Sequence, residues 1–238
     1  RGVAPITFAG LLVFGLAPLL GLRLTQWLTG TQTGATWVLS GAGLYTGFLL
    51  IALPMGLLAW WRLKALARRY AARGAKLGLV ARRADLLESL AGSLPAGAET
   101  YAADVRDLGA LRAAAADFMA KHGVPDLVIA NAGVSHGTLT EHADDAEVFR
   151  QILDINVVGM VNTFHPFVAA MRQSGRGTLA GVASVAGYRG LPGAGAYSAS
   201  KAAAIRYLES LRVEMRGTGV RVATVCPGYI ATPMTARN

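Results

Sequence analysis

The sequence predicts a doubly wound α/β domain built on a parallel sheet, preceded by two apolar, transmembrane helices. Three observations predict this arrangement. The first 61 residues contain only two charged residues, Arg1 and Arg23. All 14 acidic residues lie after them, from Asp85 onward. Beyond residue 62, short apolar runs alternate with longer helix-like segments, as strands and their covering helices do around a parallel sheet.

The N-terminal part contains two uncharged runs, Gly2–Leu22 and Leu24–Trp61. A helix of about 20 apolar residues crosses a bilayer, so we expect spans near Val3–Leu22 and Thr36–Trp61. The chain then divides into a membrane-spanning helical hairpin, residues 1–61, and an α/β domain, residues 62–238. Because positive charge favours the cytoplasmic side, that domain is placed there by five basic residues: Arg62, Lys64, Arg68, Arg69 and Arg73. An alternative stays open, in which Thr36–Ser40 is a strand and the glycines after it open a helix.

The elements of the α/β domain follow from the same alternation. Strands are predicted at short runs of apolar and β-branched residues, and helices at longer segments rich in Ala, Leu, Glu and Arg. Gly74 is a natural stop for the first helix. In chain order the prediction is helix Leu63–Arg73, strand Lys76–Ala81, helix Ala84–Leu94, strand Glu99–Ala103, helix Leu108–Lys121, strand Leu127–Asn131, helix Ala146–Met171, strand Thr178–Ser184, helix Ala196–Met215 and strand Val220–Cys226.

Residues with chemical potential gather at the carboxyl ends of the predicted strands. Asn131-Ala132-Gly133 follows one strand, Ser184 ends another, and Pro227-Gly228 follows a third. In open α/β sheets, ligands bind in the crevice at this edge. These residues therefore mark the edge where a ligand is expected.

Tyr197 and Lys201 are spaced so that they share one face of the helix that follows Ser184. An ammonium group beside a phenol favours the phenolate, which suits a general acid or base. Ser184 lies 13 residues before Tyr197, where its hydroxyl could hold a carbonyl oxygen. Alone, this spacing is weak evidence, because a solvated helix face produces it as well.

The order and approximate spacing of six motifs resemble those of the short-chain dehydrogenase/reductase family: Asn131-Ala132-Gly133, Asn156, Ser184, Tyr197, Lys201 and Pro227-Gly228. The resemblance covers about Ala65–Asn238 and implies a Rossmann-like fold. It implies that Tyr197 donates or accepts the proton and that Ser184 orients the substrate carbonyl. Lys201 would hold the nicotinamide ribose and tune Tyr197, and Asn156 would support a water-linked proton relay.

The resemblance also implies which residues contact the cofactor. Asp104 and Val105 look like the pair that meets the adenine, and Asn131, Ala132 and Gly133 like the turn that lines the adenosine ribose. Pro227, Gly228, Ile230 and Thr232 look like the segment that closes over the nicotinamide. Arg82 and Arg83 stand where an acidic residue would bind a free 2′-hydroxyl. Arginines suit a 2′-phosphate, which favours NADP(H), although a basic cluster beside a membrane explains the same residues.

The sequence departs from the family at both ends. The family opens with a strand, a glycine-rich turn and a helix whose N-terminus binds the pyrophosphate. Here Ala65–Tyr70 resembles the later part of that helix, but apolar sequence stands where the strand and turn should be. The usual final helix and strand after the nicotinamide segment are also missing. We therefore expect a Rossmann-like sheet that is incomplete at both ends.

These observations favour an NADP(H)-dependent oxidoreductase that interconverts a carbonyl and an alcohol. The alternative is a non-catalytic remnant, or a fused or mis-joined chain, that cannot bind cofactor and acts at most as a membrane or interaction module. Expected partners are a small-molecule substrate, lipid-like if the membrane tether guides it, and the membrane itself, with a homo-oligomer left open. Despite the net charge of +9, no nucleic-acid motif occurs. Dispersed histidines and one cysteine, Cys226, predicted as a buried strand residue, indicate no metal site.

Overall fold

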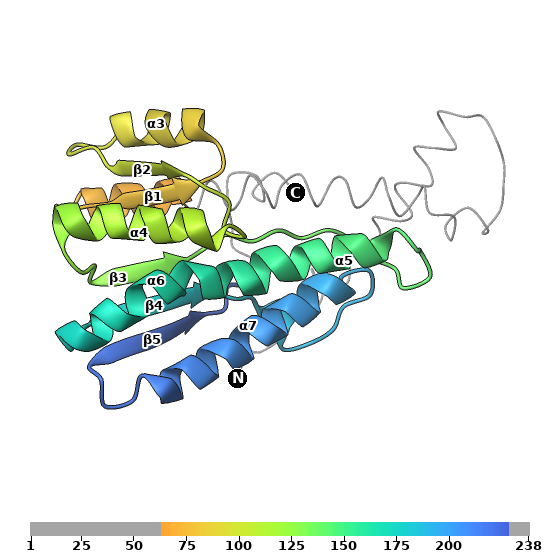
Figure 1. The fold of residues 1–238 in the computed structure, drawn as a ribbon. Coiled ribbons are helices and arrows are strands. Elements are labelled where there is room, and N and C mark those ends of the chain that lie inside the picture. The colour runs from red at the N-terminus through yellow and green to blue at the C-terminus, as the bar shows by residue number, and fades with distance from the viewer. Residues whose placement is uncertain (1–62, 229–238) are drawn as a thin grey trace, which may run out of the picture. The chain divides into compact units, whose positions relative to one another are not determined.

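The computed structural model describes residues 63–228, all within one compact unit, Met55–Asn238 (Figure 1). The two spans predicted before residue 62 lie outside the described residues, as do Ile230 and Thr232. Within this part, five parallel strands alternate with helices, so the α/β class predicted from the alternation is confirmed.

The strands form two parallel sheets. In the first, β1 (Gly78–Ala81) pairs with β2 (Glu99–Ala102). In the second, β4 (Gly177–Val182) lies between β3 (Leu127–Ala130) and β5 (Val220–Val225). The sequence predicts one sheet, but among the described strands the hydrogen-bonded ladder is interrupted between β1 and β3. The opening strand that the resemblance leads one to expect would precede residue 63, which places it outside the described residues.

In the described part of the chain, one helical segment precedes β1, and helices follow β1, β2, β3 and β4, as the alternation predicts. They are a helical segment over residues 63–71, α3 (Ala84–Gly92), α4 (Leu108–His122), α5 (Asp145–Leu153), α6 (Gly159–Ser174) and α7 (Gly195–Glu214). The predicted helix Ala146–Met171 is α5 and α6 joined by a π-helical turn, η2 (Asp154–Val158). A short 3-10 turn, η3 (Val185–Gly187), precedes α7.

Helices cover both faces of the first sheet. A Cβ built on Gly78 would meet Phe118 of α4 at 2.8 Å, whereas Leu79 packs with Leu87 and Leu90 of α3. Because successive residues of a strand point to opposite faces, α3 and α4 lie on opposite sides of β1. This is the doubly wound arrangement.

Each sheet has its own hydrophobic core. The core of the first sheet joins Leu79 to α3 and to Ala67 of the 63–71 segment. The core of the second sheet packs Phe164 of α6 and Leu208 of α7 against Leu179 of β4, and all three are fully buried. This packing holds α6 and α7, and so the residues they bear, against the ends of β3 and β4.

Among residues 63–228, one helix, Asp145–Ser174, is long and apolar enough to cross a membrane. It comprises α5, η2 and α6. Its side chains Met160 and Phe164 lie in the core of the second sheet.

Candidate active site

The carboxyl ends of β3, β4 and β5 meet at one edge. The Val185 amide donates to the Pro227 carbonyl at 3.1 Å, which ties the segment after β4 to the segment after β5. The loop after β3 reaches the start of α7, because the Thr138 amide donates to the Gly193 carbonyl at 3.0 Å. The residues at the ends of the predicted strands are therefore brought together in space.

Lys201 is buried at the centre of this edge, with 4% of its surface exposed. Its Nζ donates to the Val182 carbonyl, the last of β4, at 2.9 Å and lies 5.8 Å from the centroid of the Tyr197 ring. A solvated helix face is therefore the wrong explanation for the Tyr197–Lys201 spacing. The Tyr197 side chain itself is only partly buried, so its phenol can reach a ligand.

Ser184 lies two residues beyond β4, in extended backbone at the start of η3. Its Oγ accepts a hydrogen bond from the Ala186 amide at 3.2 Å. A hydroxyl that accepts one bond still has its own O–H to donate. The bond from Ala186 fixes the position of Ser184 Oγ, and the hydroxyl proton can still be donated to a carbonyl oxygen of a ligand.

Asn156 lies fully buried in the π-helical turn η2. Its Oδ1 accepts from the Val134 amide at 2.8 Å, and its Nδ2 donates to the Val134 carbonyl at 2.9 Å. Nδ2 also donates to Ser200 Oγ on α7 at 2.9 Å. The amide is therefore held by the loop after β3 and by α7 together.

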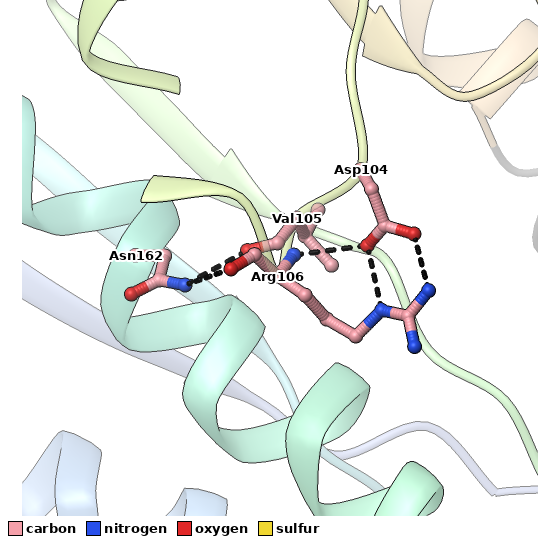
Figure 2. A network of polar contacts seen from close by, with 4 residues as sticks. All are labelled: Asp104, Val105, Arg106 and Asn162. Carbon is pink, nitrogen blue, oxygen red and sulfur yellow. Dashed lines mark hydrogen bonds and ion pairs between the residues drawn. The ribbon is translucent and has the colours of Figure 1, made fainter. Parts of the chain in front are cut away.

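The carboxyl ends of β1 and β2 carry the predicted adenosine-binding residues. Arg82 and Arg83 follow β1 and are exposed. The Asp104 carboxylate after β2 accepts from Arg106 three times, from Nη2 at 2.8 Å, Nε at 3.1 Å and the backbone amide at 2.9 Å (Figure 2). These bonds from Arg106 hold the pKa of Asp104 below its usual range, and the nearby charge of Arg82 lowers it further. A negatively charged ligand group bound here would be attracted by the guanidinium groups of Arg82 and Arg83.

The loop that carries Val105 is also held from α6. Asn162 Nδ2 donates to the Val105 carbonyl at 3.0 Å and to the Arg106 carbonyl at 3.3 Å (Figure 2). Val105 Cγ2 lies 2.6 Å from where a Cβ on Gly159 would stand. The predicted adenine-binding loop is thereby fixed to the same long helix that holds Asn156.

Gly133, in the loop after β3, lies close to both Asn156 and Lys201. A Cβ on Gly133 would stand 3.3 Å from Asn156 Oδ1 and 3.4 Å from Lys201 Nζ. An added Cβ would therefore crowd the ends of both side chains, and glycine avoids this contact. Asn131 and Ala132, which the resemblance assigns to the cofactor, precede Gly133 in the same loop after β3.

Three exposed apolar side chains follow Ser184 along the chain, Val185, Tyr188 and Leu191, and together they are called the apolar rim. The Tyr188 hydroxyl lies 3.6 Å from Cys226 Sγ, and this contact raises the pKa of the Tyr188 phenol. The prediction of a buried strand cysteine is wrong, because Cys226 is half-buried and follows the last residue of β5. It faces the rim.

Comparison with known proteins identifies the family. The profile of the short chain dehydrogenase family matches residues 64–238. The chain belongs to this family. It is 40% identical to an uncharacterized oxidoreductase of Myxococcus xanthus (strain DK1622) over 178 residues, which cover 74% of this chain and 70% of the relative.

Solved structures agree with this assignment. The closed form of serine dehydrogenase complexed with NADP+ matches with a TM-score of 0.66 and 27% identity, over 69% of this chain and 66% of that one. NAD+-bound xylitol dehydrogenase matches with a TM-score of 0.66 and 27% identity, over 73% of this chain and 68% of that one. The short-chain dehydrogenase fold is thus Rossmann-like, and the family binds nicotinamide cofactors.

Sequence reasoning missed three residues of this short-chain dehydrogenase site: Arg106, Asn162 and Ser200. Arg106 stands two residues after Asp104, a spacing at which a basic side chain can return to the carboxylate, so a signal was present. Asn162 and Ser200 act through contacts with residues 57 and 44 positions away. A local sequence pattern cannot predict contacts between residues so far apart in the chain.

Proposed function

We propose that this chain is an NADP(H)-dependent oxidoreductase that interconverts a carbonyl and an alcohol, with Tyr197 as the general acid or base. The observation that carries the proposal is the buried Lys201, whose ammonium lies beside the Tyr197 ring. A buried cation stabilises the phenolate that forms when Tyr197 gives up its proton.

Each residue has a definite task in the reduction direction. Ser184 donates its free O–H to the carbonyl oxygen, while its Oγ stays fixed by the Ala186 amide. Tyr197 transfers the phenolic proton to that oxygen, and the charge left on the phenol is stabilised by Lys201. A bound nicotinamide supplies the hydride in this direction and accepts it in the other. In alcohol oxidation, Tyr197 takes the proton back.

Asn156 supports this arrangement by its position, and a water-linked relay next to Lys201 is the role proposed for it. NADP(H) is favoured over NAD(H) by Arg82 and Arg83, whose planar guanidinium groups suit a 2′-phosphate. The exposed apolar rim of Val185, Tyr188 and Leu191 supports an apolar, lipid-like carbonyl compound as substrate.

The decisive test is Tyr197→Phe, which deletes only the hydroxyl that exchanges the proton. We expect carbonyl reduction, measured by loss of NADPH absorbance at millimolar cofactor, to fall about a hundred- to ten-thousand-fold. Tyr207→Phe is the matched control, because Tyr207 lies on the same helix and packs against the core. Near-normal turnover by Tyr197→Phe would exclude Tyr197 as the acid.

We further propose that residues 1–61 tether the enzyme to a membrane with the α/β domain on the cytoplasmic side. The proposal is supported by the uncharged runs Gly2–Leu22 and Leu24–Trp61 and by the basic residues that follow. Carbonate extraction of membranes from expressing cells should leave the chain in the pellet. Release of the chain into the carbonate supernatant would overturn the tether while leaving the proposed chemistry open to the assay above.

A further inference from the structure

Ser200 occupies a connecting position that the proposed reaction does not yet explain. It lies on α7 between Tyr197 and Lys201 and is fully buried. Its hydroxyl donates to the Tyr197 carbonyl at 2.7 Å and accepts from Asn156 Nδ2 at 2.9 Å. Both hydrogen-bonding functions of the hydroxyl are thus used inside the site.

Through these bonds, Ser200 completes a continuous path between two parts of the site. The path runs from the Val134 backbone to the Asn156 amide, then to Ser200 Oγ and to the carbonyl of Tyr197. It joins the loop after β3, where the cofactor is expected, to the turn of α7 that bears Tyr197. Asn156 Nδ2 reaches α7 at Ser200 Oγ.

The Asn156 amide is also adjacent to Lys201. Asn156 Oδ1 and Lys201 Nζ crowd the same point, 3.3 and 3.4 Å from where a Cβ on Gly133 would stand. If Ser200 lost its hydroxyl, one N–H of the buried Asn156 amide would lose its partner. A buried donor without a partner is costly, so the amide would turn or shift to satisfy it. That movement would displace its carbonyl oxygen beside Lys201.

We propose that Ser200 is a positioning residue for the carbonyl–alcohol reaction, holding Asn156 and the Tyr197 turn of α7 in register with the loop after β3. The inference rests on the proposed function for its catalytic consequence. The hydrogen-bonded link itself stands on geometry alone. Ser200 acts through Asn156 and Tyr197, and it is expected to influence turnover more than cofactor affinity.

The test compares two buried serines on the same helix. Ser200→Ala removes the linking oxygen, whereas Ser198→Ala removes a hydroxyl that is 5% exposed and has no hydrogen-bond partner within residues 63–228. In the full chain, we expect Ser200→Ala to lower kcat about ten- to a hundredfold, with KM for NADPH within about twofold of wild type. Ser198→Ala should keep the kcat of wild type. Ser200→Thr retains a hydroxyl that can bond the same carbonyl, and it should recover most of the turnover.

A second measurement separates the link from the chemistry. Thermal unfolding of Asn156→Ala, Ser200→Ala and the double variant forms a cycle that needs no turnover. We expect the double variant to lose less stability than the sum of the single variants, because either change breaks the same bond. Additive losses would overturn the link. Equal kcat for Ser200→Ala and Ser198→Ala, in a chain that does turn over, would overturn the positioning role. Absence of turnover in wild type would instead overturn the proposed function.

Discussion

At the residue scale, the proposed preference for NADP(H) depends on charge at the carboxyl ends of β1 and β2. Arg82 is exposed after β1, and its positive charge helps to lower the pKa of Asp104 after β2. The Arg106 guanidinium group already makes two hydrogen bonds to the Asp104 carboxylate. Arg82 and Arg83 are therefore the guanidinium groups best placed to meet an added phosphate.

Arg82→Ala should lower kcat/KM for NADPH more than kcat/KM for NADH. Loss of one charge-assisted contact to the 2′-phosphate corresponds to about a tenfold fall in kcat/KM for NADPH, and NADH lacks that phosphate. Arg216→Ala is the control, since Arg216 is an exposed arginine in the turn between α7 and β5. Steady-state kinetics with both cofactors measure the effect. Equal losses with NADPH and NADH would favour the basic-cluster explanation of Arg82.

The residues of the site differ in how far sequence could find them. Tyr197, Lys201 and Ser184 are candidates from sequence because they stand at fixed spacings within one strand–helix unit. That Lys201 is buried could not be read from the spacing, because its surroundings come from the end of β4. Ser200 was missed for a similar reason: a serine inside a helix is unremarkable until Asn156 is seen to donate to it across 44 positions.

At the element scale, η3 approaches α7 more closely than any side chain would allow. A Cβ on Gly187 would stand 2.8 Å from the Lys201 carbonyl carbon and 2.9 Å from its oxygen. Both atoms belong to the backbone of α7 and cannot turn aside. Gly187 thus sets the distance between the turn that carries Ser184 and the helix that carries Tyr197.

Gly187→Ala should push η3 away from α7 and damage both stability and turnover. Overpacking of this kind costs about 1–3 kcal/mol, and separation of Ser184 from Tyr197 lowers kcat. Gly190→Ala is the matched control, because nothing lies within 4 Å of a Cβ at Gly190. Urea unfolding and kcat of both variants give the comparison. A Gly187→Ala chain as stable and active as Gly190→Ala would show that η3 can move freely.

The order of elements was predictable from the sequence, but their details were not. Short runs of apolar and β-branched residues bounded by turns located all five described strands, although no residue of β2 is fully buried. The π-helical turn at Asp154–Val158 escaped prediction, since the helical periodicity continues across it into α6. The ends of β4 and β5 were placed too late, at Ser184 and Cys226, because apolar and small residues continue beyond the last ladder pair, Val182 with Val225.

At the scale of the whole molecule, the described part of the domain has two sheets and two cores. The core around Leu79 and Leu87 serves β1 and β2, and the core around Phe164 and Leu208 serves β3, β4 and β5. Arg82 and Arg83 lie at the carboxyl end of β1 in the first sheet. The Tyr197–Lys201 pair lies on α7, which packs against the second sheet. A dinucleotide would span both. The hydrogen bonds from Asn162 of α6 to the loop after β2 connect the part of the domain around the first sheet to the part around the second sheet.

Cofactor affinity therefore depends on what lies between the adenosine end and the nicotinamide end. In the family, a glycine-rich turn and a helix N-terminus supply backbone N–H groups to the pyrophosphate. In this sequence, apolar residues stand where that strand and turn should precede Ala65. Arg82 and Arg83 attract phosphate, but they do not replace the close backbone approach that glycine permits.

We accordingly expect the full chain to bind NADPH with a Kd well above about 1 µM, the value that corresponds to about −8 kcal/mol. Titration of the detergent-solubilised protein followed by NADPH fluorescence measures it. A micromolar or tighter Kd would contradict the expectation and show that another segment, with Ser40–Gly47 the foremost candidate, supplies the phosphate site. A variant that carries a glycine-rich strand and turn grafted before Ala65 is the positive arm. Tightening of NADPH binding in the graft, without change in the Tyr197–Lys201 pair, would assign the weak affinity to the missing turn.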